Sequence, residues 1–410
     1  MVKYFGSFVK NILYTILIFL LSTLTVQSQG IKYRYIRLAL TEHCKTMISP
    51  QDDVQTVFVK IYFGEATNFH EFIKNNTNFM LAWSIKDNPE ETIIFSDSIP
   101  LGAQNFKIVN DYIECKFRTP LLPADKAQFL TLKFHHPESK QTYVMYDRIT
   151  NTSDYTFPFF PKKHESIFPL FDQYCHTKDT IEINSTTNDS ITVQHLNTTD
   201  SLALPPMYLG QNPYESSKTI QFFKLSSNTK WVPLNSGLYT FSSTKHSSKF
   251  SIVVLQHKFP TFTKVNELIS SLQYLTTNDE HATLIAATKQ KEALDEFLIN
   301  LTGDKNLAKN IIKNYFKRVT EANRLFTTTK EGWKTDKGMI YIIFGQPDKV
   351  YYENGHEDWS YEKNPLYNEL NFYFQHKNTP EGYIFELERL KDYQEIWIAI
   401  IEKWRRGLIK

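Results

Sequence analysis

The sequence predicts a multidomain chain in which antiparallel β-sandwich-like regions come first and an α+β region follows. Three observations lead to this prediction. Aromatic residues make up 15% of the chain, with 31 Phe and 23 Tyr, and aromatic enrichment favours strands. Apolar residues alternate with polar ones in the first part of the chain, whereas helical spacing begins near residue 261. With 410 residues, the chain is long enough for two or three domains.

The N-terminus has the pattern of a secretory signal peptide over residues 1–28. Lys3 and Lys10 precede an apolar stretch from residue 12 to residue 24, and small residues follow up to Ser28. A membrane anchor is the competing interpretation, but the stretch is shorter than the roughly 18–20 residues that span a bilayer. We therefore expect an exported, soluble protein of the periplasm or outer membrane, with no transmembrane segment after cleavage. No cysteine follows the cleavage site, so a lipoprotein anchor is not expected.

Residues 29–150 predict the first β-sandwich-like domain. Period-2 alternation marks the segments 55–64, 78–87 and 128–136, and turn-forming sequences such as KDNPEE and HPESK separate them. Residues 151–260 predict a second β-rich domain with Ser/Thr/Asn-rich loops, because short strands reappear at 219–226, 237–243 and 250–259. Both regions lack the long helical stripes that appear later in the chain.

Residues 261–410 predict an α+β domain. Segment 288–303 is a helix that Gly303 can end, and Asp304 can cap the next helix, 306–326. That helix carries a wide apolar stripe that includes Ile311, Tyr315 and Phe326. Strands are expected at 338–345, 348–352, 358–362, 369–377 and 382–389, and a closing helix at 392–409.

The segment KEGWKTDKGMIYIIFGQPDKV, residues 330–350, is dense in residues that form turns or bind ligands. We interpret Gly332 as a segment end and Trp333 as a side chain that fills a helix–sheet interface. Thr335 to Gly338 read as a tight turn, in which Asp336 can hydrogen-bond the backbone two residues on and Gly338 can take positive φ. Residues 339–344 then read as a buried strand, and residues 345–348, with Gly345, Pro347 and Asp348, as the next turn. This structural interpretation is favoured over a catalytic or binding role.

This segment resembles the GWxTD domain, a family of exported proteins in Bacteroidota and neighbouring Gram-negative bacteria. The sequences YFKRVTEANRLF upstream, EDWSYE with Trp359 downstream, and EIWIAIIEKWRRG at the end are similar to the family's other motifs, in order. The resemblance covers roughly residues 265–410, and Lys337 departs from the arginine that many members carry. It implies a fold and an exported location, and no established activity.

Sequence motifs for chemistry are scarce. The chain has no Gly-x-Ser-x-Gly, phosphate loop, dinucleotide fingerprint or zincin helix, and His135 and His136 point to opposite faces of a strand, so no metal or cofactor is expected. A net charge of +2 argues against a nucleic-acid binder. The favoured function is a non-enzymatic envelope protein that binds or scaffolds a protein partner in outer-membrane assembly or secretion. The alternative is a hydrolase acting on peptide or glycan through Asp336 and Asp348.

Two further features concern covalent modification. Asp-Ser/Thr-aliphatic triplets resemble the O-glycosylation signal of Bacteroidota, and they make Ser98, Thr180, Ser190 and Ser201 candidate acceptors. The three cysteines Cys44, Cys115 and Cys175 leave one thiol over, and their spacing does not decide which two would pair. Cys115 shares a strand face with apolar residues and reads as a buried small hydrophobe. The sequence leaves the ligand, the partner's identity and the oligomeric state open.

Overall fold

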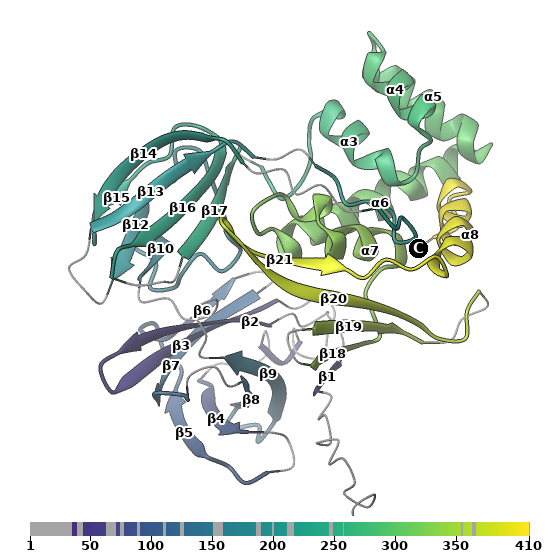
Figure 1. Ribbon diagram of the computed structural model, residues 1–410. Coiled ribbons are helices and arrows are strands. Elements are labelled where there is room, and N and C mark those ends of the chain that lie inside the picture. The colour runs from purple at the N-terminus through teal and green to yellow at the C-terminus, as the bar shows by residue number, and fades with distance from the viewer. Residues whose placement is uncertain are drawn as a thin grey trace, which may run out of the picture.

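A computed structural model describes residues 35–38, 44–62, 71–73, 78–87, 91–109, 112–123, 127–150, 159–185, 190–198, 201–210, 217–245, 249–256, 258–353, 356–362 and 366–409. The expected signal peptide, residues 1–28, lies outside them. Figure 1 shows three parts: a purple-to-blue sandwich, a teal sandwich and a green-to-yellow part in which helices lie against a sheet. Within the described residues, no helix is both long enough and apolar enough to cross a membrane.

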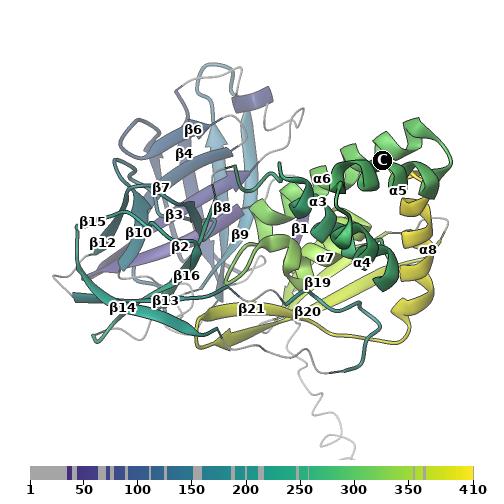
Figure 2. The same cartoon turned by 90° about the horizontal axis from the view of Figure 1, so that it is seen from above.

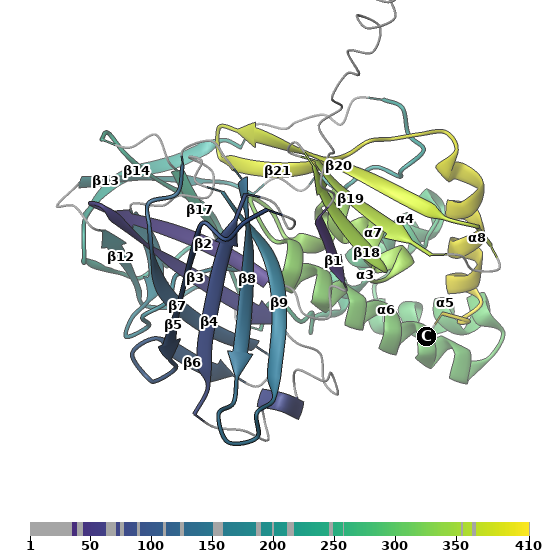
Figure 3. The ribbon, with the colours of Figure 1, turned by 90° about the horizontal axis from the view of Figure 1, so that it is seen from below.

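The first sandwich consists of two four-stranded antiparallel sheets with the orders β2-β3-β7-β6 and β5-β4-β8-β9. Alternation produces its core: Val57, Val59 and Ile61 of one sheet and Leu130 and Leu132 of the other are fully buried, as expected from the sequence. Figure 3 shows β4, β8 and β9 side by side. The strands are β2 (Cys44–Gln51), β3 (Val54–Tyr62), β4 (Met80–Lys86), β5 (Phe95–Pro100), β6 (Phe106–Val109), β7 (Tyr112–Pro120), β8 (Ala127–His135) and β9 (Thr142–Thr150).

The second sandwich pairs a three-stranded sheet, β10-β12-β15, with a five-stranded sheet, β11-β17-β16-β13-β14. Only β11 and β17 run parallel among these described strands. All three cysteines are reduced and buried, with Cys44 and Cys115 in the first sandwich and Cys175 in β11. The strands are β10 (Phe159–Lys163), β11 (Tyr174–His176), β12 (Ile181–Ser185), β13 (Ser190–Leu196), β14 (Thr219–Ser226), β15 (Lys230–Trp231), β16 (Gly237–Ser243) and β17 (Lys249–Leu255).

The C-terminal part packs helices against one face of a five-stranded antiparallel sheet, as Figure 2 shows from above. The expected caps are present: Gly303 ends α5 at φ 69°, and the Asp304 carboxylate accepts from the amides of Asn306 and Leu307 at the start of α6. The helices are α3 (Val265–Ser271), η2 (Leu272–Tyr274), α4 (Asn278–Ala286), α5 (Gln290–Thr302), α6 (Lys305–Phe326), η3 (Gly332–Lys334), α7 (Asp336–Phe344) and α8 (Tyr393–Arg405). The strands are β1 (Tyr35–Leu38), β18 (Lys349–Glu353), β19 (His356–Tyr361), β20 (Leu370–Thr379) and β21 (Gly382–Leu387).

One expected element of this part is wrong. Residues 339–344 were expected to form a buried strand, but they belong to helix α7. The run is buried on all sides, and a continuous apolar run of six residues fits a buried helix as well as a buried strand. The hydroxyl of Thr335 decides between them, because it caps the backbone of α7 at Gly338.

Strand β1 comes early in the sequence but pairs with a strand of the C-terminal part. Residues 35–38 fall in the range that the sequence assigned to the first sandwich, yet β1 pairs antiparallel with β18, with Arg37 opposite Val350. β1 is therefore the edge of the C-terminal sheet, beside β18 in Figure 3. A long-range strand pairing of this kind leaves no local signature in the sequence.

A buried ionic cluster lies where the three parts meet. Asp172, in the loop before β11, accepts from Lys45 Nζ at 3.1 Å, from Lys60 Nζ at 2.7 Å and from the Tyr62 hydroxyl. Lys45 Nζ also donates to the carbonyl of Arg324 on α6, at 3.2 Å. Burial alone would raise the pKa of Asp172, but the two ammonium groups outweigh it and hold the pKa well below its usual value. One carboxylate thus links both sandwiches to the C-terminal part.

We expect Asp172→Ala to lower the free energy of unfolding by about 3–5 kcal/mol, because it leaves Lys45 without its counter-charge and Lys60 with only Glu114, at 4.0 Å. Urea titration followed by circular dichroism measures this change. Asp295→Ala is the matched control, because its partner Lys291 is exposed and such pairs contribute about 0–1 kcal/mol. A loss of similar size in both variants would contradict the prediction.

The Asp172 contribution should also depend on pH in a defined direction. A carboxyl whose pKa is lowered by folding stabilises the fold above its unfolded pKa of about 3.9, and loses that contribution as the pH falls towards the folded value. The difference in unfolding free energy between the wild type and Asp172→Asn should therefore be constant near neutrality and shrink below about pH 4.

Candidate functional site

The GWKTD turn, residues 332–336, connects the end of α6 to the start of α7 through the short 3-10 helix η3. Thr335 is the N-cap of α7. Its hydroxyl accepts from the Gly338 amide at 3.0 Å and donates to the Gly332 carbonyl at 2.7 Å. The threonine therefore satisfies a free helix amide and fixes the geometry of the turn at the same time.

Close backbone contact requires glycine at two positions, one in the turn and one in the first part of α7. A Cβ on Gly332 would lie 2.0 Å from the carbonyl oxygen of Ala322 in α6. A Cβ on Gly338 would lie 1.9 Å from the carbonyl oxygen of Gly332. The tight turn expected over residues 335–338, in which Gly338 could take positive φ, is wrong, because residues 336–338 begin α7 and Gly338 is not left-handed. It is space, and not backbone conformation, that requires glycine there.

Trp333 is a core residue of the turn, with 3% of its surface exposed. Its ring packs edge-on against Phe262 and Tyr274. Its amide donates to Asn323 Oδ1 at 3.0 Å, its Nε1 donates to Glu331 at 2.5 Å, and its carbonyl accepts from the Tyr274 hydroxyl at 3.0 Å. Every polar group of Trp333 thus has a partner within the chain.

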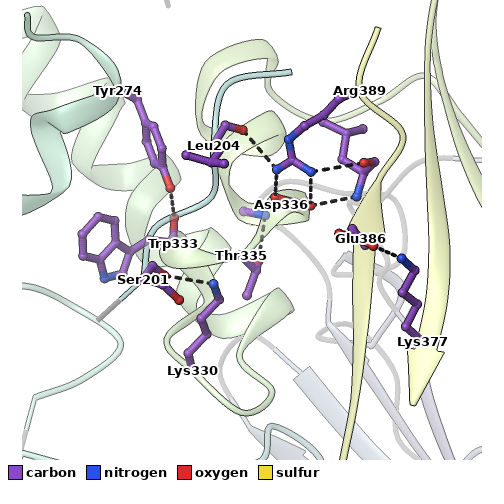
Figure 4. A network of polar contacts seen from close by, with 12 residues as sticks. Ser201, Leu204, Tyr274, Lys330, Trp333, Thr335, Asp336, Lys377, Glu386 and Arg389 are labelled. Atoms are coloured by element: carbon purple, nitrogen blue, oxygen red, sulfur yellow. Dashed lines mark hydrogen bonds and ion pairs between the residues drawn. The ribbon is translucent and has the colours of Figure 1, made fainter. Parts of the chain in front are cut away.

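Asp336 is buried, with 5% exposure, and forms an ion pair with Arg389, just beyond β21. Oδ1 accepts from Arg389 Nη2 at 2.6 Å, while Oδ2 accepts from Arg389 Nη1 at 3.2 Å and from the Leu387 amide at 2.8 Å. Figure 4 shows the guanidinium above the carboxylate, and Nη2 also donates to the Leu204 carbonyl. Asp336 occupies the first turn of α7, where the helix dipole favours a negative charge.

The next residue, Lys337, forms a second buried ion pair. Its Nζ donates to Glu357 Oε2 at 2.7 Å, and the ammonium lies 3.2 Å from the centre of the Phe385 ring. Glu357 Oε1 accepts from the indole of Trp359 at 2.7 Å. Trp359 is fully buried against Phe326 and belongs to the same core as the turn. These contacts join α7 to β19 and β21.

The other sequence-predicted motif residues lie at the far end of α7. Gly345 ends the helix with φ 86°, which glycine adopts readily, and Pro347 is buried beyond it. Asp348 is exposed and accepts from the Glu362 amide at 2.6 Å. Asp336 is in the first turn of α7 and Asp348 follows the other end of this nine-residue helix, which is about 13 Å long. The structure does not bring these two carboxylates together.

A groove of about 520 Å³ adjoins the Asp336–Arg389 pair, between the loop 208–210 and the hairpin of β20 and β21. Tyr208 and Leu209 are half-exposed on one side, and Lys377 pairs with Glu386 on the other. Arg389 lines one end, where its Nε is buried with no hydrogen-bond partner among the described residues. Because both pairs of opposite charges neutralise each other, the groove suits an uncharged ligand better than acid–base chemistry.

The remaining predicted sites are scattered over the molecule. Ser98 on β5 and Ser190 at the start of β13 are exposed, whereas Thr180 and Ser201 are partly buried. The Ser201 carbonyl accepts from Lys330 Nζ at 2.9 Å. The described residues contain no group of three His, Cys, Asp or Glu side chains that could hold a metal ion. No shared site emerges from these positions.

Sequence reasoning missed the roles of two residues that organise the turn, although Asn323 lies in the motif YFKRVTEANRLF. Asn323 accepts from the Trp333 amide and donates to the Pro260 carbonyl at 3.0 Å. Arg389 supplies the partner of Asp336 from 53 residues away. Asn323 within an apolar helix stripe was a usable signal, since a buried amide requires hydrogen-bond partners. Arg389 lies in a charged strand end and offered no comparable signal.

The family model described as the GWxTD domain matches residues 237–406. No curated protein matches the chain. Solved structures similar to parts of it include dimeric latent PorU from Porphyromonas gingivalis, with 9% identity over 57% of this chain and 21% of PorU, at a TM-score of 0.23. Three N-terminal domains of the bacteriophage RB49 outer capsid protein Hoc give 7% identity over 54% of this chain and 59% of that one, at a TM-score of 0.16. The mouse nectin-like molecule 4 ectodomain gives 9% identity over 56% of this chain and 68% of that one, also at 0.16.

Replacing Gly338 with alanine should destabilise the chain more than its helix propensity suggests. Alanine is the better helix former by about 1 kcal/mol, but the added Cβ would meet the Gly332 carbonyl at 1.9 Å. We expect a net loss of about 1–3 kcal/mol, typical of overpacking, measured by thermal and urea unfolding. Gly303→Ala is the control, because positive φ applies there and no atom lies within 4 Å. Equal or raised stability of Gly338→Ala would contradict the steric argument.

Removing the Asp336 carboxylate should cost about 3–5 kcal/mol, because Asp336→Ala leaves the Arg389 guanidinium buried and unpaired. The double variant Asp336→Leu with Arg389→Met should recover much of that loss, since both charges are then gone. Urea unfolding of the single variants Asp336→Leu and Arg389→Met and of the double variant measures the coupling. Additive losses would show that the pair does not couple.

Proposed function

This chain carries a GWxTD domain, and on that premise we propose that it is a non-enzymatic, exported cell-envelope protein that binds or scaffolds a protein partner. The observation that supports this proposal is the state of the motif. The side chains of Trp333, Thr335 and Asp336 all form hydrogen bonds with other residues of the chain. A residue engaged in this way builds a framework, and does not offer a free group to a substrate.

A scaffolding role also agrees with how the parts are joined. The cluster around Asp172 links the first sandwich to the second. Phe58 of the first sandwich also packs against Phe160 of the second, with 5.2 Å between the ring centres. Such contacts hold the parts in a defined arrangement, which a protein that positions partners requires. Export, with cleavage near Ser28 and a location in the periplasm or at the outer membrane, remains part of the proposal and rests on the sequence pattern of residues 1–28.

The hydrolase alternative would need a free acid and a free base within reach of one bond. The buried Asp336 is paired with Arg389, and Asp348 stands at the opposite end of α7. These positions favour the binding protein over the hydrolase.

The proposal is tested by affinity capture from an envelope extract, followed by reconstitution with the purified candidate partner. Size-exclusion chromatography with light scattering should show a complex of fixed stoichiometry. In parallel, the wild type and Asp348→Asn are assayed against fluorogenic peptides and glycans. Turnover by the wild type that Asp348→Asn abolishes, with no reconstituted complex, would contradict a non-enzymatic role.

A further inference from the structure

The outer edge of β14 is the most exposed apolar strand edge of the second sandwich. Ile220 and Phe222 are 60% and 62% exposed, although they stand on an eight-residue strand. Their side chains lie on the face opposite the core, because Phe223 and Leu225 are the residues of β14 that pack inward. Figure 1 shows β14 at the rim of the teal sandwich.

This edge lacks the protection that the other edges of the sandwich have. β11 has three residues and β15 has two, while β10 carries Pro161 and two lysines. β14 contains no proline and one charge, Lys224, and it pairs only with β13 among the described strands. A long apolar edge with free backbone groups is a template for another strand.

The charge around the edge indicates what kind of strand would pair there. None of the five strands β11, β17, β16, β13 and β14 contains an Asp or a Glu. Lys218 and Lys224 flank the exposed apolar pair, and residues 217–231 hold three lysines with no acid. A second copy of the same edge would bring lysines towards lysines, so charge complementarity favours a different partner that is acidic.

We propose that β14 binds an extended, acidic segment of a partner protein by strand addition, with apolar residues against Ile220 and Phe222 and a carboxylate near Lys224. Backbone hydrogen bonds supply affinity in this mode, and the side chains of alternate residues supply specificity. The site lies in the second sandwich, away from the GWKTD turn. This inference rests on the proposed function, and it names the surface that carries it.

The probe is a fluorescein-labelled peptide with glutamates at both ends and alternating threonine and valine between them. Fluorescence anisotropy should show saturable binding to the full chain, and a version with lysines replacing the glutamates should bind at least tenfold more weakly. A version with a central proline should lose binding, because proline removes a ladder donor. Hydrogen exchange should show new protection confined to residues 219–226. Equal binding of the acidic and basic probes, or protection elsewhere, would overturn the proposal.

Substitutions distinguish binding at the β14 edge from nonspecific binding to exposed apolar residues. Ile220→Ser with Phe222→Ser should weaken acidic-probe binding at least tenfold and leave the unfolding midpoint unchanged, since both side chains are exposed. Ile285→Ser with Ile398→Ser removes a similar exposed apolar area on α4 and α8, and should leave binding unchanged. A concentration-dependent dimer that the β14 variant abolishes would identify a second copy as the occupant, contrary to the proposal.

The envelope complex distinguishes this inference from the proposed function. If the reconstituted complex forms equally well with the β14 double variant, the binding function stands and the β14 surface is rejected. If the double variant loses the complex while the control variant keeps it, both are supported. If no complex forms with the wild type, the proposed function fails irrespective of the probe results.

Discussion

The ion pair between Asp336 and Arg389 is the interaction on which the C-terminal part depends. It brings the start of α7 to the end of β21, and the Leu387 amide on the same carboxylate fixes how these elements meet. The Gly332 carbonyl must then pass close to Gly338, so the two glycines become steric requirements of that placement. A buried charge with complete partners also penalises alternative arrangements, since any shift would leave a carboxylate or a guanidinium unpaired in the interior.

The first and third parts of the fold could be predicted where burial is one-sided. Alternation along β8 and the apolar stripe of α6 each report which face is covered, and the structure confirms both. Along β3 both faces are buried, because Phe58 also packs into the core of the second sandwich. Residues 339–344 are covered on all sides, so their sequence carried no period to read. The pairing of β1 with β18 and of Asp336 with Arg389 are contacts between distant segments, which a single sequence does not encode locally. The motif's position was therefore predictable, but its partners were not.

The junction between the parts is polar at its centre and apolar around it. Asp172 binds Lys45, Lys60 and Tyr62, while Met47 and Phe58 of the first sandwich pack into the core of the second. Ser251 of β17 donates to the Glu381 carbonyl in the β20–β21 turn, which joins the second sandwich to the C-terminal sheet. The buried charges make one arrangement of the parts preferable to others, because charged groups tolerate little displacement from their partners.

The contrast between the turn and the β14 edge bears on where function resides. In the turn, Trp333 and Asp336 are buried, and their hydrogen bonds hold α6, α7 and β21 together. At β14, apolar side chains face solvent and the outer strand edge is unpaired among the described strands, which is costly unless something binds there. The turn therefore forms part of the framework, and the exposed strand is the surface that we propose for the partner.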